Sequence, residues 1–110
     1  MITWDRVNEL RDEIGADDFQ EVVEIFLEEV DEVIERLKET PDPACYEQDM
    51  HFLKGSALNL GFAQFSELCQ SYETAAANGK TDVVCLGPLF ELYAASKAAF
   101  LSGIGHNQAA

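Results

Sequence analysis

Apolar residues recur every three or four positions along almost the whole chain, which is the pattern of helices that bury one face. Glycine and proline interrupt this pattern at a few points and divide the chain into five predicted helices. These helices cover residues 4–14, 18–39, 43–60, 63–77 and 82–101. We find no period-two alternation and predict no strands. Four long helices with short connections predict an all-α, antiparallel four-helix bundle, with a short additional N-terminal helix across one end.

Residues at the predicted helix starts fit the known preferences for helix capping. Thr3 precedes the first helix and Asp17 the second, and both are good N-caps. Gln20 follows Asp17 at the third helical position, which completes the pattern of a capping box. Asp42 and Pro43 suit the N-cap and the first helical position of the third helix. We therefore expect the third helix to begin at Pro43.

The helix ends are predicted from glycine and proline. Gly15, Gly61 and the pair Asn78-Gly79 are natural stops for the first, third and fourth helices. The fifth helix has two alternatives, because Gly87-Pro88 either kinks it or marks its true beginning at Pro88. Residues 103–110 are expected to form a flexible tail. With no linker or repeat, residues 1–110 are predicted to form a single domain.

Composition narrows the classes of function. The chain has 110 residues, of which 47% are hydrophobic, enough for one core. Its net charge of −14, from 21 acidic and 7 basic residues, argues against binding to nucleic acid or to an anionic membrane. No apolar stretch approaches the ~20 residues that span a bilayer, and no signal peptide is visible. We expect a cytoplasmic protein.

Cysteine and histidine spacing predicts no metal site. Cys45, Cys69 and Cys85 are widely spaced and odd in number, so neither a disulfide framework nor a zinc site is indicated. Glu47 and His51 stand four apart, whereas a carboxylate-bridged metal bundle needs two Glu-x-x-His copies on facing helices. We therefore expect buried, reduced thiols and no intrinsic metal.

A helical wheel of residues 42–60, drawn at about 100° per residue, separates a core stripe from an exposed face. The stripe consists of Tyr46, Met50, Leu53, Ala57 and Leu60. His51 lies about 140° from the centre of this stripe. The imidazole is therefore predicted to face solvent or a partner rather than the core.

The neighbours of His51 on this face suggest chemistry at the imidazole. Gly55 stands one turn later, although glycine inside a helix costs about 0.5–1 kcal/mol relative to alanine. Because helical side chains lean toward the N-terminus, a larger residue at position 55 would cover the imidazole. Lys54 could neutralise charge on a phosphoryl group in the same space. Leu58, apolar and on the exposed face, is a candidate contact for a docking partner.

The run His51-Phe52-Leu53-Lys54-Gly55-Ser56-Ala57, followed by Leu60-Gly61, resembles the signature of histidine-containing phosphotransfer (HPt) domains. That family's pattern is His-x-Leu-Lys-Gly-Ser-Ser/Ala, with Leu-Gly a few residues later. Downstream, Glu67-Leu68-Cys69 and Tyr72-Glu73 are similar to the family's next helix. The resemblance covers residues 43–79 in sequence and most of the chain in helix order.

The resemblance implies a phosphorelay carrier rather than an enzyme with its own ATP site. His51 would accept a phosphoryl group from the phospho-aspartate of one receiver domain, through Nε2, and pass it to another. Lys54 would assist the phosphoryl group and Gly55 would give access. Some members place a glutamine on the next helix against the imidazole. Glu73 departs from that version, and its carboxylate could accept from Nδ1–H and fix the tautomer.

The partners implied by the resemblance are receiver domains of hybrid histidine kinases and response regulators. These receivers would supply Mg²⁺, so the chain itself needs no cofactor. The docking surface is expected to centre on His51 and to include Lys54, Leu58 and, from the first helix, Ile14. One histidine per bundle suffices for the relay, so we expect a monomer.

Two other interpretations compete with this one. Gly79-Lys80-Thr81 resembles the end of a phosphate-binding loop, but the pattern needs a glycine where Thr74 stands, and no strand precedes it. The other is a helical bundle that docks to receiver domains or other signalling proteins without being phosphorylated. This interaction module has the same docking surface, so only phosphorylation of His51 separates it from a carrier.

Overall fold

The computed structural model describes the backbone of residues 2–109 and the side chains of residues 2–104. Its α-helices are α1 (Trp4–Ile14), α2 (Ala16–Glu39), α3 (Tyr46–Leu60), α4 (Ala63–Ala77) and α5 (Leu86–Ala109). Two 3-10 turns, η1 (Pro43–Cys45) and η2 (Thr81–Val83), precede α3 and α5. Within residues 2–109 no strand forms, apart from an isolated bridge between Ile2 and Phe62. The prediction of an all-α fold is confirmed.

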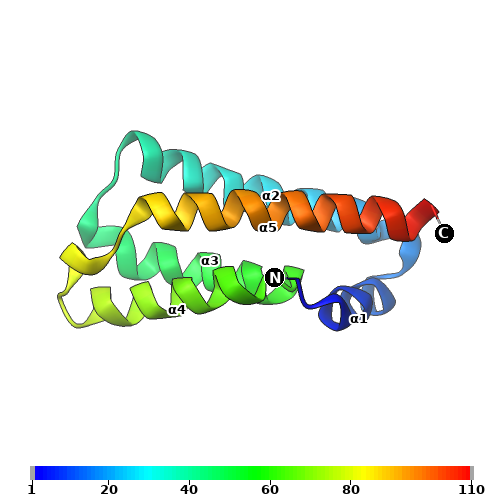
Figure 1. Ribbon diagram of the computed structural model, residues 1–110, viewed down its shortest axis with the longest axis horizontal. Helices are drawn as coiled ribbons and strands as arrows, with labels where there is room; N and C mark the ends of the chain where they lie inside the picture. Colours follow the sequence, from blue (N-terminus) through cyan, green and yellow to red (C-terminus); the bar gives the residue numbers. More distant parts are fainter. Residues whose placement is uncertain (1, 110) are drawn as a thin grey trace.

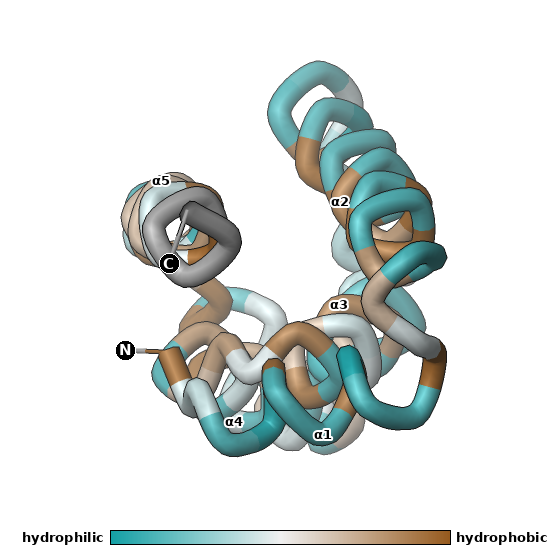
Figure 2. The backbone as a smooth tube through the Cα atoms, turned by 90° about the vertical axis from the view of Figure 1, so that its right-hand side faces the viewer, coloured by the Kyte–Doolittle hydropathy of each residue, from teal (hydrophilic) through white to brown (hydrophobic). Residues whose placement is uncertain are grey.

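The four long helices run antiparallel to their neighbours along the chain (Figure 1). α3 and α4 form a hairpin of two helices with 15 residues each. α2 and α5 have 24 residues each and extend beyond one end of this hairpin (Figure 1). α1 lies at that end, where it continues the layer of α3 and α4 opposite α2 and α5 (Figure 2). The predicted four-helix bundle with one short additional helix is therefore present.

The apolar stripes of all five helices meet in a single core. Its largest fully buried side chains include Phe19, Leu37, Met50, Leu53, Leu60, Phe62, Phe65, Leu89 and Phe100. Trp4 of α1 stacks on Phe100 of α5, with ring centroids 6.2 Å apart, and Phe62 meets Phe100 edge-on at 5.4 Å. Burying each such side chain contributes about 1.5–3 kcal/mol, so the stripes that predict the helices also hold them together.

Polar side chains connect α5 to the acidic helix α2. The Tyr93 hydroxyl donates a hydrogen bond to Asp31 Oδ1 at 2.6 Å, and Lys97 Nζ donates to Asp31 Oδ2 at 2.8 Å. Burial raises the pKa of the Tyr93 phenol, so this hydroxyl stays protonated and acts as the donor. One carboxylate of α2 thus receives two bonds from α5.

The start of α3 differs from the sequence prediction by a few residues. Asp42 does act as a cap, and its carboxylate accepts a hydrogen bond from the Ala44 N–H at 3.0 Å. The element that it caps is the 3-10 turn η1, with Pro43 at its first position, and α3 itself begins at Tyr46. Short 3-10 turns are frequent at helix N-termini, where the first N–H groups lack partners.

The end of α3 is fixed by Gly61, as predicted. Gly61 has a φ of 76°, a left-handed conformation that glycine adopts without strain. It also touches the N-terminal segment, because the Thr3 N–H donates to Gly61 O at 2.7 Å. A Cβ on Gly61 would lie 2.7 Å from Thr3 O. Only glycine therefore allows the N-terminus to pack against the turn between α3 and α4.

Capping at the first two helices is weaker than predicted. α1 has the predicted bounds, but the Thr3 side chain makes no capping hydrogen bond. α2 begins at Ala16 with Gly15 as its N-cap, so Asp17 lies in the first turn and the predicted capping box with Gln20 does not form. Gly15 has a φ of 98°, which lets α1 and α2 join through one residue. Asp17 still suits its position, because acidic residues are favourable near a helix N-terminus.

Helix α5 begins close to Pro88, as in the second of the two alternatives, and it ends later than predicted. It begins at Leu86, so Pro88 lies in the first turn, where its missing N–H has no helical partner to lose. The backbone stays helical to Ala109, eight residues beyond the predicted end at 101, and the predicted tail at 103–110 is helical as far as it is described. Ala110 lies outside the described residues, and the flexibility of 103–110 stays a prediction.

Close packing explains why Gly103 does not end α5. A Cβ on Gly103 would lie 2.0 Å from a ring carbon of Trp4, so the glycine makes room for the indole of α1. The next residue, Ile104, is buried and continues the apolar stripe that contains Phe100. Glycine is tolerated inside the helix here because tertiary packing outweighs its low propensity.

Candidate functional site

Helix α3 presents His51 on the face that the wheel predicts. Every residue of the predicted core stripe is buried, whereas the His51 side chain is 70% exposed. The core stripe therefore anchors the helix and leaves the imidazole outside the core. This placement of His51 is confirmed by the structure.

Gly55 lies one turn after His51 in an unbroken helix. No side chain or other helix lies within 4 Å of the position that a Cβ would occupy. Neighbouring packing therefore gives no reason for a glycine here, in contrast to Gly103. The open space next to the imidazole is what the sequence predicts for a site that another protein must reach.

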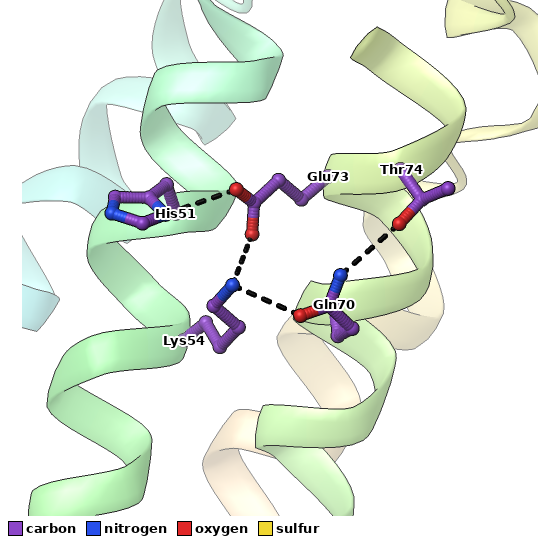
Figure 3. Close-up of polar contacts among 5 residues, drawn as sticks. All are labelled: His51, Lys54, Gln70, Glu73 and Thr74. Atoms are coloured by element: carbon purple, nitrogen blue, oxygen red, sulfur yellow. Dashed lines mark hydrogen bonds and ion pairs between the residues drawn. The ribbon is translucent and has the colours of Figure 1, made fainter. Parts of the chain in front are cut away.

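Glu73 of α4 contacts the imidazole across the hairpin. His51 Nδ1 and Glu73 Oε2 are 2.9 Å apart. A carboxylate can only accept a hydrogen bond, so the assigned tautomer carries its proton on Nδ1. The lone pair of the neutral ring then resides on Nε2, which points away from Glu73 (Figure 3). The fold thus brings together two residues that are 22 positions apart in the sequence.

Lys54 lies in the gap between α3 and α4 and not over the imidazole (Figure 3). Its Nζ forms an ion pair with Glu73 Oε1 at 2.6 Å and donates to Gln70 Oε1 at 2.9 Å. Gln70 in turn donates from Nε2 to Thr74 Oγ1 at 3.1 Å. Five side chains from two helices thus form one chain of polar contacts.

Gln70 and Thr74 are site residues that the sequence reasoning missed. With Glu73 they stand at positions 70, 73 and 74, a spacing that places three polar side chains on one face of α4. That spacing was visible in the sequence. What was missing was the register between α3 and α4, which decides that this face meets Lys54.

The charges at the site compensate one another. The hydrogen bond from Lys54 holds the pKa of the Glu73 carboxyl below its usual value, against the opposing effect of partial burial, and the bond from His51 adds to the lowering. Glu73 is therefore a carboxylate at neutral pH. Burial raises the pKa of the nearby Cys69 to about 12, so this thiol is protonated and is not a nucleophile.

Two hollows flank the exposed face of α3. One, of about 500 Å³, is lined by Glu47, Gln48, His51 and Glu73. The other, of about 370 Å³, is mostly apolar, and its lining includes Thr3, Arg6, Leu58 and Phe62. Leu58 is 56% exposed at the rim of this apolar hollow, which agrees with its predicted position on the exposed face. Docking at Leu58 stays a prediction.

Ile14 is placed less favourably for docking. It is half-buried and packs against the core at the last position of α1, which extends beyond the ends of α3 and α4 (Figure 1). The segment at Thr3 touches Gly61, and α1 then runs about 16 Å further to Ile14. A part in docking stays a prediction for Ile14, and Arg6 near the start of α1 is closer to Leu58.

Other candidate sites find no support among the residues described. Within residues 2–104, no group of three His, Cys, Asp or Glu side chains is arranged to hold a metal ion. In the described part of the chain, no helix is both long and apolar enough to cross a membrane. Gly79, the first residue of the Gly-Lys-Thr run, follows the end of α4 with a φ of 75°, and Thr74 lies inside that helix.

The fold and the site together define a class of protein: a helical bundle that presents the exposed imidazole of His51 beside two antiparallel helices. A family model for the Hpt domain matches residues 21–98, more than half of the chain. The chain therefore belongs to the Hpt domain family, and its role lies in histidine phosphotransfer within phosphorelays. Comparisons with curated proteins and with solved structures gave no significant match.

Proposed function

We propose that this chain is a phosphorelay carrier that accepts a phosphoryl group on His51 Nε2 from the phospho-aspartate of one receiver domain and passes it to another. The observation that carries the proposal is the imidazole itself. It is 70% exposed, donates from Nδ1 to Glu73 and has open space beside it at Gly55. A nucleophile in this position can be reached by another protein while its tautomer is held.

The proposed transfer balances without any further reactant. The Nε2 lone pair forms a bond to phosphorus as the bond from phosphorus to the aspartyl oxygen breaks, and the carboxylate leaves with the electron pair. The imidazole keeps its Nδ1 proton, so positive charge develops on the ring. The Glu73 carboxylate at 2.9 Å from Nδ1 lies where it stabilises that charge. Transfer to the second receiver is the same reaction in reverse.

The remaining parts of the site fit this role. Phosphoryl transfer depends mainly on positioning and charge stabilisation, and metal ions supply much of the latter. We propose that Mg²⁺ arrives with the receiver domain and that Lys54 supplies positive charge at the site. The apolar hollow beside Leu58 offers a contact surface next to the imidazole. A small, transient interface suits a carrier that must leave each receiver quickly. We further propose that the carrier is a cytoplasmic monomer, because one histidine per bundle suffices for the relay.

The experiment that tests the proposal is transfer from a receiver domain phosphorylated with labelled acetyl phosphate. We expect wild type to gain a label that is lost in acid and stable in base, as a phosphoramidate is. His51→Gln should gain none. The matched control is His106→Gln, because His106 is the other of the two histidines in the chain. It should be labelled like wild type.

The same experiment tests the alternative of an interaction module that is not phosphorylated. If folded wild type gains no label from several phosphorylated receivers but binds them, the carrier proposal is wrong and the docking module is favoured. Label on His51→Gln would place the chemistry at another residue.

A further inference from the structure

The ammonium group of Lys54 is directed at Glu73 rather than at the nucleophilic nitrogen. Nζ contacts Glu73 Oε1 at 2.6 Å and Gln70 Oε1 at 2.9 Å, and the Lys54 side chain is 20% exposed. His51 uses Nδ1 to reach the other oxygen of the same carboxylate. The two nitrogens of an imidazole point in nearly opposite directions, so Nε2 faces away from Lys54 (Figure 3). A phosphoryl group on Nε2 would lie on the far side of the ring from Nζ.

The hydrogen bonds around Lys54 show how it is held there. The ammonium group donates a hydrogen bond to Gln70 Oε1 and forms an ion pair with Glu73 Oε1. The amide of Gln70 is oriented by a hydrogen bond that its Nε2 donates to Thr74 Oγ1 at 3.1 Å. This bond leaves Oε1 of Gln70 directed at Lys54. Thr74 and Gln70 thus fix the lysine, and the lysine fixes the carboxylate.

The negative charge around the imidazole explains why Glu73 needs a cationic partner. The hollow at the imidazole is lined by two carboxylates, Glu47 and Glu73, on a chain with a net charge of −14. A bare Glu73 would repel an incoming phosphoryl group, yet its Oε2 is needed to hold the Nδ1 proton. An ion pair at Oε1 neutralises much of that charge and leaves Oε2 free to accept from the imidazole.

We propose that Lys54 acts on His51 through Glu73 and not by binding the phosphoryl group, and that Gln70, held by Thr74, is a positioning residue for Lys54. This inference rests on the proposed function of His51 as the phosphorylated residue. It assigns the contact chain Thr74–Gln70–Lys54–Glu73–His51 to one task, which is to hold the imidazole with its lone pair on Nε2. It also changes the role that the sequence suggests for Lys54.

A double-mutant cycle separates action through Glu73 from direct contact with the phosphoryl group. The variants are Lys54→Met, Glu73→Ala and the double variant, with Lys80→Met as a matched control on the exposed loop after α4. Two mutations that act through one contact are not additive, whereas independent ones are. The first readout is the pair of ¹⁵N chemical shifts of the His51 ring in the unphosphorylated protein, which reports the tautomer. The second is the rate of phosphoryl transfer from a receiver phosphorylated with acetyl phosphate.

We expect Lys54→Met to shift the His51 tautomer and to slow transfer by about tenfold, since it removes a charge-assisted contact from the carboxylate. In the Glu73→Ala background, Lys54→Met should leave the ¹⁵N shifts of the His51 ring unchanged and alter the transfer rate by no more than about twofold. Gln70→Ala should shift the tautomer in the same direction by less, and Lys54→Arg, which keeps the charge, should restore the wild-type shifts. Lys80→Met should match wild type throughout.

Equal slowing by Lys54→Met in both backgrounds, with unchanged ¹⁵N shifts, would overturn the proposal and show direct contact with the phosphoryl group. The tautomer measurement needs no receiver, so it remains decisive if wild type gains no label and the proposed function fails. An unchanged tautomer in Lys54→Met and in Gln70→Ala refutes the inference in that case too. Circular dichroism of each variant confirms that it is folded before it is counted.

Discussion

Gly55 allows access and stability to be tested against each other at a single position. It lies inside α3 with a helical backbone, and no neighbouring side chain or helix lies within 4 Å of the place of its missing Cβ. Alanine therefore fits without displacing any neighbour. A leucine at this position would extend its side chain toward His51, one turn nearer the N-terminus.

The expected stability gain follows from helix propensity alone. Replacing glycine by alanine inside a helix contributes about 0.5–1 kcal/mol to the free energy of unfolding. Over 110 residues, an unfolding entropy of about 2.1 cal/mol/K per residue converts this gain into a rise in Tm of about 2–4 °C. We expect Gly55→Ala to show this rise in a calorimetric or circular dichroism melt.

Transfer should follow the size of the side chain rather than the stability. A single methyl group at position 55 leaves most of the imidazole accessible, so we expect Gly55→Ala to transfer within about twofold of wild type. For Gly55→Leu we expect a loss on the order of ten- to hundredfold, because the reacting atoms can no longer reach their working distance. The assay is the rate of label transfer from a phosphorylated receiver under single-turnover conditions.

Gly87 provides the matched control, because it lies in the first turn of α5 and has equally open space at its Cβ position. Gly87→Ala and Gly87→Leu should leave transfer unchanged. A wild-type transfer rate in Gly55→Leu would refute the idea that the glycine gives access. A lower Tm in Gly55→Ala would show that the glycine is needed by the fold.

Two further predictions test the docking surface and the end of α5. Leu58→Asp should slow transfer by about tenfold without unfolding the chain, because Leu58 is 56% exposed. The control is Val83→Asp on η2, where the side chain is 50% exposed. A normal transfer rate in Leu58→Asp would place docking elsewhere. Gly103→Ala should lower the free energy of unfolding by about 1–3 kcal/mol in a urea titration, because its Cβ would overlap the Trp4 ring. Gly55→Ala serves as its control, and a stabilised Gly103→Ala would contradict the packing between α1 and α5.

The parts of the fold that sequence predicts best are those that depend on local periodicity. α1 and α4 have the predicted bounds, and the whole core stripe of α3 is buried. Burial of one helical face requires a spacing of three and four residues, so the spacing identifies the face without any knowledge of the partner helix. For the same reason the exposure of His51 could be predicted from α3 alone.

The predictions that failed depend on contacts between distant segments. A glycine at position 103 ordinarily indicates a helix end, and only the packing of Trp4 explains why the helix continues. Asp17 and Gln20 have the spacing of a capping box, but Gly15 with its positive φ starts α2 two residues earlier than predicted. In both places a local rule is overridden by a neighbour that the sequence does not place beside it.

The site shows the same division between local and tertiary information. The sequence predicts that Lys54 lies next to the phosphoryl group, because it stands three residues after His51 and the two side chains share one side of α3. The register of the α3–α4 hairpin places the Glu73 carboxylate in contact with both side chains, and the Lys54 ammonium forms an ion pair with this partly buried anion. Glu73 has an 18% exposed side chain and would be poorly solvated without that partner. The role that we propose for Lys54 therefore depends on the glutamate at position 73, whose Oε1 forms an ion pair with Nζ at 2.6 Å.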